Sequence, residues 1–157
     1  MLALNNFPQG EYQTAVGQQR PLAYQMFDQS RARARLSRIK EFFTGKRRMP
    51  TLAGRMAGRA VRAQHSLGLR SVEVEAITGT ESRADDFDPQ FNPRADRICS
   101  RWVRIAELRQ RQAYLPAVEL IQVGSEYFVR DGHHRISVAR ALGVAFIDAQ
   151  VTLIELG

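Results

Sequence analysis

The sequence predicts an α/β protein of the α+β type, with a small mixed sheet and helices preceded by a basic, mainly helical N-terminal region. The hydrophobic fraction of 44% is enough for a modest core in a chain of 157 residues. The apolar pattern changes near residue 70 from helical spacing to strand alternation. The charge changes there too, because residues 1–70 carry 13 basic and 3 acidic residues and residues 71–157 carry 10 and 13. We therefore expect a basic arm, 1–70, and a domain, 71–157.

Two helices are expected in the arm, at residues 21–43 and 51–66. Pro21 suits the first turn of the first helix. Thr51 is expected to cap the second helix and Gly68 to end it. The apolar stripe expected on the first helix consists of Leu36, Ile39 and Phe43.

Rows of arginines on other faces of these helices, with the basic run between them, indicate a surface for a polyanion. Nucleic acid is the first candidate partner, because phosphate contacts need charge and little else. An anionic membrane surface is an alternative, since apolar residues such as Leu36 and Phe43 could lie in its interface. A third alternative is an acidic protein surface. It could belong to another protein, to the chain's own C-terminal domain or to a second copy of the chain in a homo-oligomer. The residues expected to contact nucleic acid are Arg31, Arg35, Arg38, Lys46, Arg47, Arg48, Arg55, Arg59 and Arg62.

The domain is expected to follow the order strand, loop, helix, two strands, helix and one or two final strands. Alternating Val and Glu predict the first strand, and apolar residues at helical spacing predict the first helix. The expected ranges are a strand at 70–77, a polar loop at 78–94, a helix at 95–112, paired strands at 116–123 and 127–130, a helix at 131–143 and the final strand or strands at 144–156.

The run "YFVRDGHHRIS" concentrates polar residues where a strand turns into a helix. Free backbone amides and the helix dipole favour an anion at a helix N-terminus. Gly132 permits a positive φ and close backbone approach, and Arg135 could grip a phosphate through two hydrogen bonds. One of His133 and His134 could assist, but adjacent helical residues point about 100° apart, so the two cannot act alike.

A purely structural interpretation of the same run stays open. Asp131 could simply cap the helix, and Gly132 could simply make the turn. No metal ligand is assigned, because a chelating histidine pair on a helix needs a spacing of four residues and these are adjacent.

The run "YLPAVELIQVGSEYFVRDGHHRISVARALGVAFIDAQV" resembles the ParB/sulfiredoxin-like superfamily, in which this strand–turn–helix contributes to a nucleotide phosphate site. ParB domains carry a "GERR" form, sulfiredoxins a "GGCHR" form, and free-serine kinases of the same fold a "DGHHR"-like form, which is the closest. The loop "GTESRADDF" stands where ParB proteins have an arginine-containing loop. The resemblance covers residues 71–153 and implies binding of CTP, ATP or ADP, with or without Mg²⁺.

Departures from these motifs limit what the resemblance implies. His133 replaces the sulfiredoxin cysteine and Cys99 lies elsewhere, so reduction of a sulfinic acid is not expected. His133 also replaces the Glu of "GERR", so the CTP hydrolysis of ParB proteins is not carried over.

The loop after the first strand supplies further candidates for the same site. Glu81 is matched to the catalytic acid of the kinases, and Ser82 and Arg83 could contact the phosphate. Three nearby carboxylates could hold Mg²⁺ through their oxygens, or could belong to a solvated acidic loop. They are Asp85, Asp86 and Asp88.

We therefore expect a cytoplasmic protein that binds a nucleotide or another phosphorylated ligand, with the arm contacting nucleic acid or a partner. The first alternative is a phosphoryl-transfer enzyme, a small-molecule kinase or nucleotide hydrolase, that uses Glu81, Asp131 and Mg²⁺. The second is a structural or interaction protein whose ParB-like fold has no ligand. No apolar run approaches the ~18 residues of a membrane-spanning helix. The expected ligand-binding residues are Gly132, His133, His134, Arg135, Ser82 and Arg83.

Overall fold

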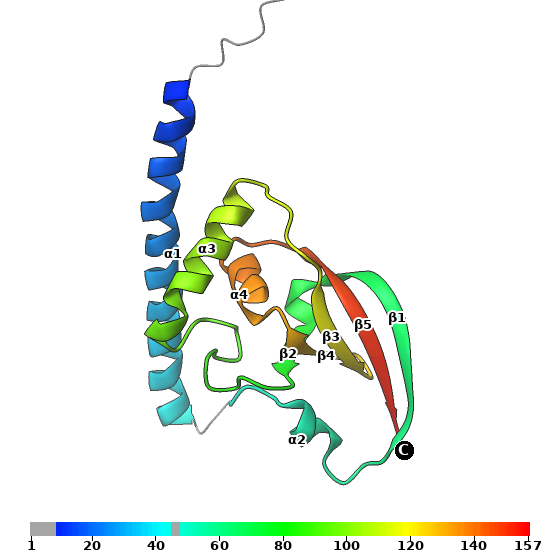
Figure 1. Ribbon diagram of the computed structural model, residues 1–157. Coiled ribbons are helices and arrows are strands. Elements are labelled where there is room, and N and C mark those ends of the chain that lie inside the picture. Colours follow the sequence, from blue (N-terminus) through cyan, green and yellow to red (C-terminus); the bar gives the residue numbers. More distant parts are fainter. Residues whose placement is uncertain (1–8, 45–47) are drawn as a thin grey trace, which may run out of the picture.

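The computed structural model describes residues 9–44 and 48–157, and in them a five-stranded mixed sheet is covered by helices (Figure 1). The strands are β1 (Val61–Glu73), β2 (Ile77–Thr80), β3 (Val118–Val123), β4 (Glu126–Asp131) and β5 (Phe146–Leu156). The helices are α1 (Gln9–Thr44), α2 (Leu52–Met56), α3 (Cys99–Gln110) and α4 (His133–Ala141), and two 3₁₀ turns are η1 (Val74–Ala76) and η2 (Asp96–Ile98). The expected mixed α/β fold is confirmed. None of the described helices is long and apolar enough to cross a membrane.

The sheet has the strand order β1-β5-β3-β4-β2. β3 and β4 form the expected antiparallel hairpin, β5 lies parallel to β3, and β1 lies antiparallel to β5. β2 lies parallel to β4, with Thr80 opposite Val129. Because parallel strands end at the same edge of a sheet, the loop after β2 and the turn into α4 leave the sheet together.

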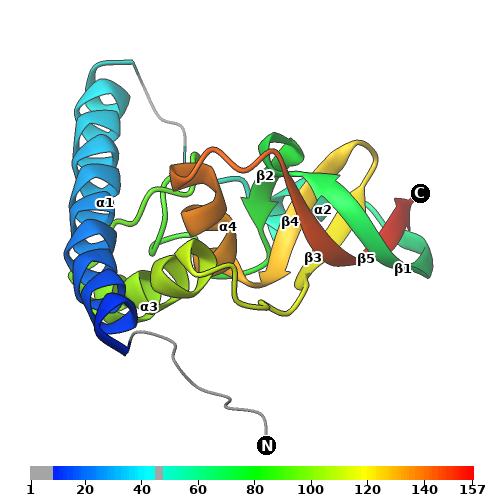
Figure 2. The same ribbon diagram turned by 90° about the horizontal axis from the view of Figure 1, so that it is seen from above.

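Apolar side chains cover both faces of the sheet. On one face, α3 and α4 lie between the sheet and α1, as both views show (Figures 1 and 2). Trp102 is fully buried there, and its indole N–H donates to Ser137 Oγ of α4 at 2.8 Å. On the other face, Leu52 of α2 packs in a second cluster with Phe128 and Ile154. The site described below therefore rests on a sheet that is packed from both sides.

The buried face of α1 does not coincide with the expected apolar stripe. The helix is longer than the expected 21–43, since it begins at Gln9 and contains Pro21 in its interior. Phe27 is 2% exposed and its ring meets Trp102 edge-on, with 5.6 Å between the ring centroids. The expected apolar stripe of Leu36, Ile39 and Phe43 is exposed and is not the face that packs on the domain. The buried face consists of Ala23, Phe27, Ser30 and Ala34.

The second predicted helix is wrong beyond its first turns. Thr51 caps α2 as expected, accepting from the Gly54 amide at 3.1 Å, but α2 ends at Met56. β1 begins at Val61 and pairs with β5 over its whole length. Gly68, the expected stop, lies within β1 at a bulge with φ of 68°. Long-range pairing with β5 has overridden the local pattern, so Arg55, Arg59 and Arg62 do not form a helical row.

The predicted strand at 70–77 is split into two. β1 ends at Glu73, η1 turns the chain, and β2 begins at Ile77 at the other edge of the sheet. Residue 70, at which we divided the chain, lies inside β1. Residues before it also join the opposite edge, because the Thr80 amide donates to Pro50 O at 2.9 Å.

Candidate functional site

α4 begins with an N-terminus that no side chain caps. Gly132 is the N-cap residue with φ of 100°, a left-handed conformation that favours glycine. A Cβ atom there would lie 2.5 Å from Val118 Cγ1, so the close approach also requires glycine. The first helical bond runs from Ile136 N to Gly132 O at 3.0 Å, which leaves the three preceding amides without an intrahelical acceptor. The structural alternative that Asp131 caps the helix is wrong.

Asp131 and Arg135 instead form an ion pair across the first turn of α4, with 2.6 Å between Oδ2 and Nη2. Arg135 Nη1 also donates to the carbonyl oxygens of Pro116 and Ala117 at 2.5 and 3.0 Å. The Arg135 side chain is 14% exposed and ties the segment before β3 to the helix. The Arg135 guanidinium is thus already hydrogen-bonded to three oxygen atoms of the protein, whereas we expected it to be available for a phosphate.

The two histidines are part of the core. His133 and His134 are 3% and 6% exposed, and both rings pack against Phe87. His133 Nε2 lies 2.6 Å from Thr80 Oγ1. Burial first, and nearby guanidinium groups second, lower the pKa of both imidazoles to about 4. Both rings are therefore neutral at pH 7, and neither can serve as a cation for a phosphate.

Arginines from two other elements lie beside the start of α4. Besides burial, the positive charge of the Arg83 guanidinium lowers the pKa of His133. The positive charges of Arg101 and, to a smaller extent, Arg83 lower the pKa of His134 in the same way. Arg83 lies in the loop after β2 and Arg101 lies on α3, so positive charge approaches the helix from two sides. The helix dipole has the same sign at this end, and together they favour an anion.

An open groove of about 780 Å³ lies between α3 and the start of α4. Its α3 wall carries Arg101 and Arg104, three residues apart and both exposed. Neither arginine forms an ion pair within the described parts of the chain. Apolar residues of α3 and the segment before β3 form the rest of the surface. The lining residues are Ser100, Arg101, Arg104, Ile105, Leu108, Leu115, Pro116, Ala117, Glu119, Asp131 and Arg135.

Sequence reasoning missed Arg101 and Arg104. A signal was present, because two arginines at i and i+3 on the polar face of a predicted amphipathic helix share one side of it. What the sequence could not show is that this side faces the turn into α4. In the described part of the chain, Arg101 and Arg104 of α3 are exposed cations on the groove wall, whereas His133 and His134 are buried.

Glu81 and Asp131, the two expected catalytic carboxylates, engage different arginines. Glu81 follows β2 and Asp131 is the last residue of β4, and these two parallel strands end at the same edge of the sheet, as expected. Glu81 accepts two hydrogen bonds from Arg130, at 3.2 and 3.3 Å, and is not among the groove residues. Asp131 lines the groove. Ser82, another expected ligand, is exposed and its amide donates to Thr80 Oγ1 at 3.1 Å.

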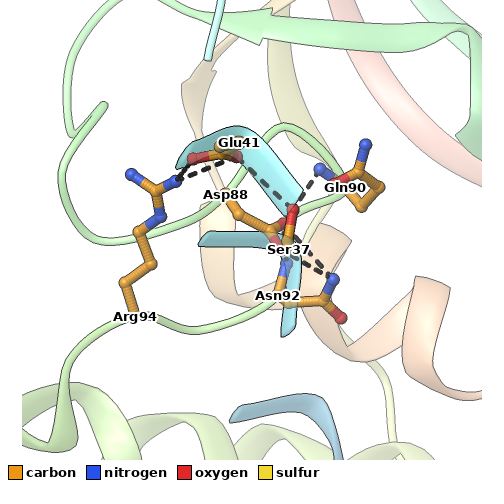
Figure 3. A network of polar contacts seen from close by, with 6 residues as sticks. All are labelled: Ser37, Glu41, Asp88, Gln90, Asn92 and Arg94. Carbon is orange, nitrogen blue, oxygen red and sulfur yellow. Dashed lines mark hydrogen bonds and ion pairs between the residues drawn. The ribbon is translucent and has the colours of Figure 1, made fainter. Parts of the chain in front are cut away.

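The acidic loop residues hold the loop together. Asp88 is fully buried and accepts from the amides of Gln90 and Asn92 at 2.9 and 2.8 Å (Figure 3). Asp86 is 7% exposed and pairs with Arg97. Across residues 9–44 and 48–157, no group of three or more His, Cys, Asp or Glu side chains could hold a metal. Of the two alternatives left open for Asp85, Asp86 and Asp88, a shared Mg²⁺ site has no such group behind it in these residues, and a fully solvated loop does not fit the burial of Asp86 and Asp88.

The basic residues expected to contact nucleic acid do not share one surface. The Arg31 side chain is 12% exposed and pairs with Asp96 at 2.7 Å, and Arg55 pairs with Glu126 at 2.5 Å. Those that are exposed on α1, on the segment after it, and around the start of β1 are Arg35, Arg38, Arg48, Arg59 and Arg62. Lys46 and Arg47 lie outside the described residues.

Comparison with protein-family models, curated proteins and solved structures gave no match to this chain. The resemblance of the "DGHHR" run to the ParB/sulfiredoxin-like superfamily therefore stays a prediction from the motif.

Proposed function

We propose that the protein binds a phosphorylated small molecule, in the first place a nucleotide, in the groove between α3 and the start of α4. The observation that carries the proposal is the pair Arg101 and Arg104, two exposed guanidinium groups with no acidic partner among residues 9–44 and 48–157, on the wall beside an uncapped helix N-terminus. Guanidinium groups suit phosphate oxygens because they donate through a planar fork. The resemblance of this turn to the nucleotide phosphate site of a ParB/sulfiredoxin-like fold supports the same assignment.

The remainder of the groove suits the non-phosphate part of such a ligand. Its volume of about 780 Å³ lies in the range typical of small-molecule sites. Ile105, Leu108 and Leu115 offer an apolar surface for a flat ring. Glu119 and Asp131 offer carboxylate oxygens that can accept hydrogen bonds from hydroxyl or amino groups. A nucleoside phosphate combines all three features.

Binding is favoured over phosphoryl transfer because only one of the two expected carboxylates faces the groove. Glu81 is held by Arg130, and Asp131 is paired with Arg135. An enzyme that uses Asp131 as a base would lose turnover in Asp131→Asn while retaining ligand affinity, by the ~10²–10⁴-fold typical of general acid–base residues. Nucleotide consumption with Mg²⁺ and a panel of hydroxyl acceptors, including free serine, measures this. Contact of the N-terminal region with nucleic acid stays a separate prediction.

The test is a thermal-shift screen with nucleoside mono-, di- and triphosphates, with and without Mg²⁺, followed by calorimetry. Each charged hydrogen bond contributes about 1.5–3 kcal/mol, so Arg101→Ala/Arg104→Ala should weaken the best ligand at least about 100-fold. Arg59→Ala/Arg62→Ala is the matched control, because these two arginines are exposed outside the groove. Absence of binding by any phosphate ester, or an affinity that ignores the Arg101 and Arg104 substitutions, would refute the proposal.

A further inference from the structure

The C-terminal part of α1 carries large apolar side chains in solvent. Leu36, Ile39, Phe42 and Phe43 are 60%, 58%, 86% and 79% exposed, and we call these four residues the α1 patch. The rings of Phe42 and Phe43 meet edge-on with 5.6 Å between centroids. Singly exposed apolar residues are ordinary on protein surfaces, but four within two turns of one helix form a contiguous patch.

Contacts on the opposite face of α1 fix the direction in which the patch points. The Glu41 carboxylate pairs with Arg94 at 3.2 Å, so the C-terminal turns are tied to the loop before α3 (Figure 3). Arg31 pairs with Asp96 and donates to the carbonyl oxygen of Arg94. Phe27 is buried against Trp102 on this same side. The helix cannot rotate the patch inward without breaking these contacts.

The patch is a ridge without a second wall. A shallow hollow of about 390 Å³ lies on it, and every described residue that lines this hollow belongs to α1. Side chains of a single helix form a convex surface, which cannot enclose a small molecule. The shape suits an extended, deformable surface that receives the side chains from one side.

The charges around the patch are all positive or already paired. Arg35 and Arg38 line the hollow with the aromatic rings and are exposed. Between residues 31 and 44 the sequence has one acidic residue, Glu41, which Arg94 holds on the opposite side. The next charged residues after α1 are all basic; they are Lys46, Arg47 and Arg48. A partner that fits this surface is therefore anionic and also accepts apolar side chains.

We propose that the α1 patch docks peripherally on the surface of membranes that contain anionic lipids. Phe42 and Phe43 would enter the layer between headgroups and acyl chains, and Arg35 and Arg38 would contact lipid phosphates. A second copy of the chain is a poorer occupant, because pairing two such ridges would bring arginines together. Nucleic acid would satisfy the arginines but leave the patch in water.

The test uses the full chain and vesicles of phosphatidylcholine alone or mixed with phosphatidylglycerol, separated by sedimentation. We expect binding only to the mixed vesicles, weakening as salt screens the charges. Arg35→Glu/Arg38→Glu should weaken it at least about 25-fold, from about fivefold for each arginine lost near the surface. Phe42→Ser/Phe43→Ser should weaken it at least about tenfold.

Matched controls separate the patch from general surface properties. Leu69→Ser/Tyr114→Ser removes two apolar residues that are 60% and 88% exposed outside α1, and should leave vesicle binding unchanged. Arg59→Glu/Arg62→Glu makes the same charge change outside α1 and should reduce binding far less. All four variants change exposed side chains, so circular dichroism should show unaltered folding.

Three outcomes would overturn the proposal. The first is that the unchanged protein does not bind the mixed vesicles. The second is that the control pairs weaken binding as much as the patch pairs do. The third is that the patch belongs to another partner. Light scattering would show this by a dimer that Phe42→Ser/Phe43→Ser dissociates, and a DNA-binding assay would show it by duplex binding that depends on the same two residues.

Discussion

Two pairs of arginines with the same spacing have different surroundings in this molecule. Arg101 and Arg104 on α3 face a groove whose second wall is the start of α4. Arg35 and Arg38 on α1 stand on a ridge beside exposed aromatic rings, and the described residues that line this surface all belong to α1. Both pairs are exposed, and neither forms an ion pair in the part of the chain that the structure describes. The comparison teaches that two arginines alone do not define a partner. A surrounding groove suits a small phosphorylated molecule, whereas an open ridge suits an extended anionic surface.

The two arginine pairs are linked mechanically through α3. One side of α3 packs on α1 through the contact of Trp102 with Phe27, while another side carries the groove pair. Trp102 is also hydrogen-bonded to Ser137 of α4. The position of the groove wall therefore depends on the docking of α1, and substitutions can test the two regions separately.

The largest effect is expected where α1 meets α3. Phe27→Ala removes a buried ring, and such truncations cost about 3–5 kcal/mol of the free energy of unfolding. Phe43→Ala, on the exposed side of the same helix, should change it by less than about 0.5 kcal/mol. Urea unfolding measures both. Equal, small effects would mean that α1 is a detached arm and that the two regions are independent.

Acid should destabilise the α4 region through its buried histidines. The pKa of His133 and of His134 is about 4 in the folded protein and has an ordinary value of 6.5, so the unfolded chain binds more protons between these pH values. Stability is then full above pH 6.5 and falls as the pH drops towards 4. Between pH 7 and pH 5 the loss should be about 2 kcal/mol for each histidine.

Urea unfolding at several pH values measures this loss, and single substitutions assign it. His134→Leu should remove about half of the pH dependence, because it removes one of the two buried imidazoles. A dependence that survives His134→Leu undiminished would contradict the burial of this imidazole as its cause.

The start of α4 should be more sensitive than another turn of the same sheet. Gly132→Ala places a Cβ 2.5 Å from Val118 at φ of 100°, and strain plus overpacking should cost about 2–4 kcal/mol. Gly124→Ala, in the β3–β4 turn at φ of 61°, meets nothing within 4 Å and should cost only about 1 kcal/mol. Urea midpoints compare them. Equal losses would show that the backbone conformation, not the contact with Val118, requires glycine at position 132.

The smallest expected effect separates two arginines on α1. Arg31→Ala loses a hydrogen bond to the carbonyl of Arg94 and an ion pair with the exposed Asp96, together worth about 1–2 kcal/mol. Arg35→Ala, on the exposed side, should leave stability unchanged within about 0.5 kcal/mol. Thermal unfolding is sensitive enough for this comparison. A larger loss for Arg35 would mean that the helix packs through its other side.

The strand–turn–helix around Gly132 could be predicted from the sequence, together with the hairpin before it and the amphipathic α3. The candidate site could be predicted only in part. The motif located the turn at which we propose anion binding, but His133 and His134 are buried, and the exposed cations Arg101 and Arg104 come from α3. The motif around Gly132 carries no information about which side of α3, a helix distant in the sequence, will face this turn.

The sequence by itself determined the elements whose periodicity and glycine turns are local, because neighbouring residues decide whether a strand alternates or a helix starts. Only the tertiary structure decided that residues 61–73 form a strand, since β1 exists by pairing with β5 at the far end of the chain. It also decided which face of α1 is buried. The predicted stripe of Leu36, Ile39 and Phe43 is the more hydrophobic, but the small residues Ala23 and Ala34 let α1 approach α3 closely while Phe27 reaches Trp102. Periodicity measures how apolar a face is, whereas close packing depends on the shape of the partner that meets it.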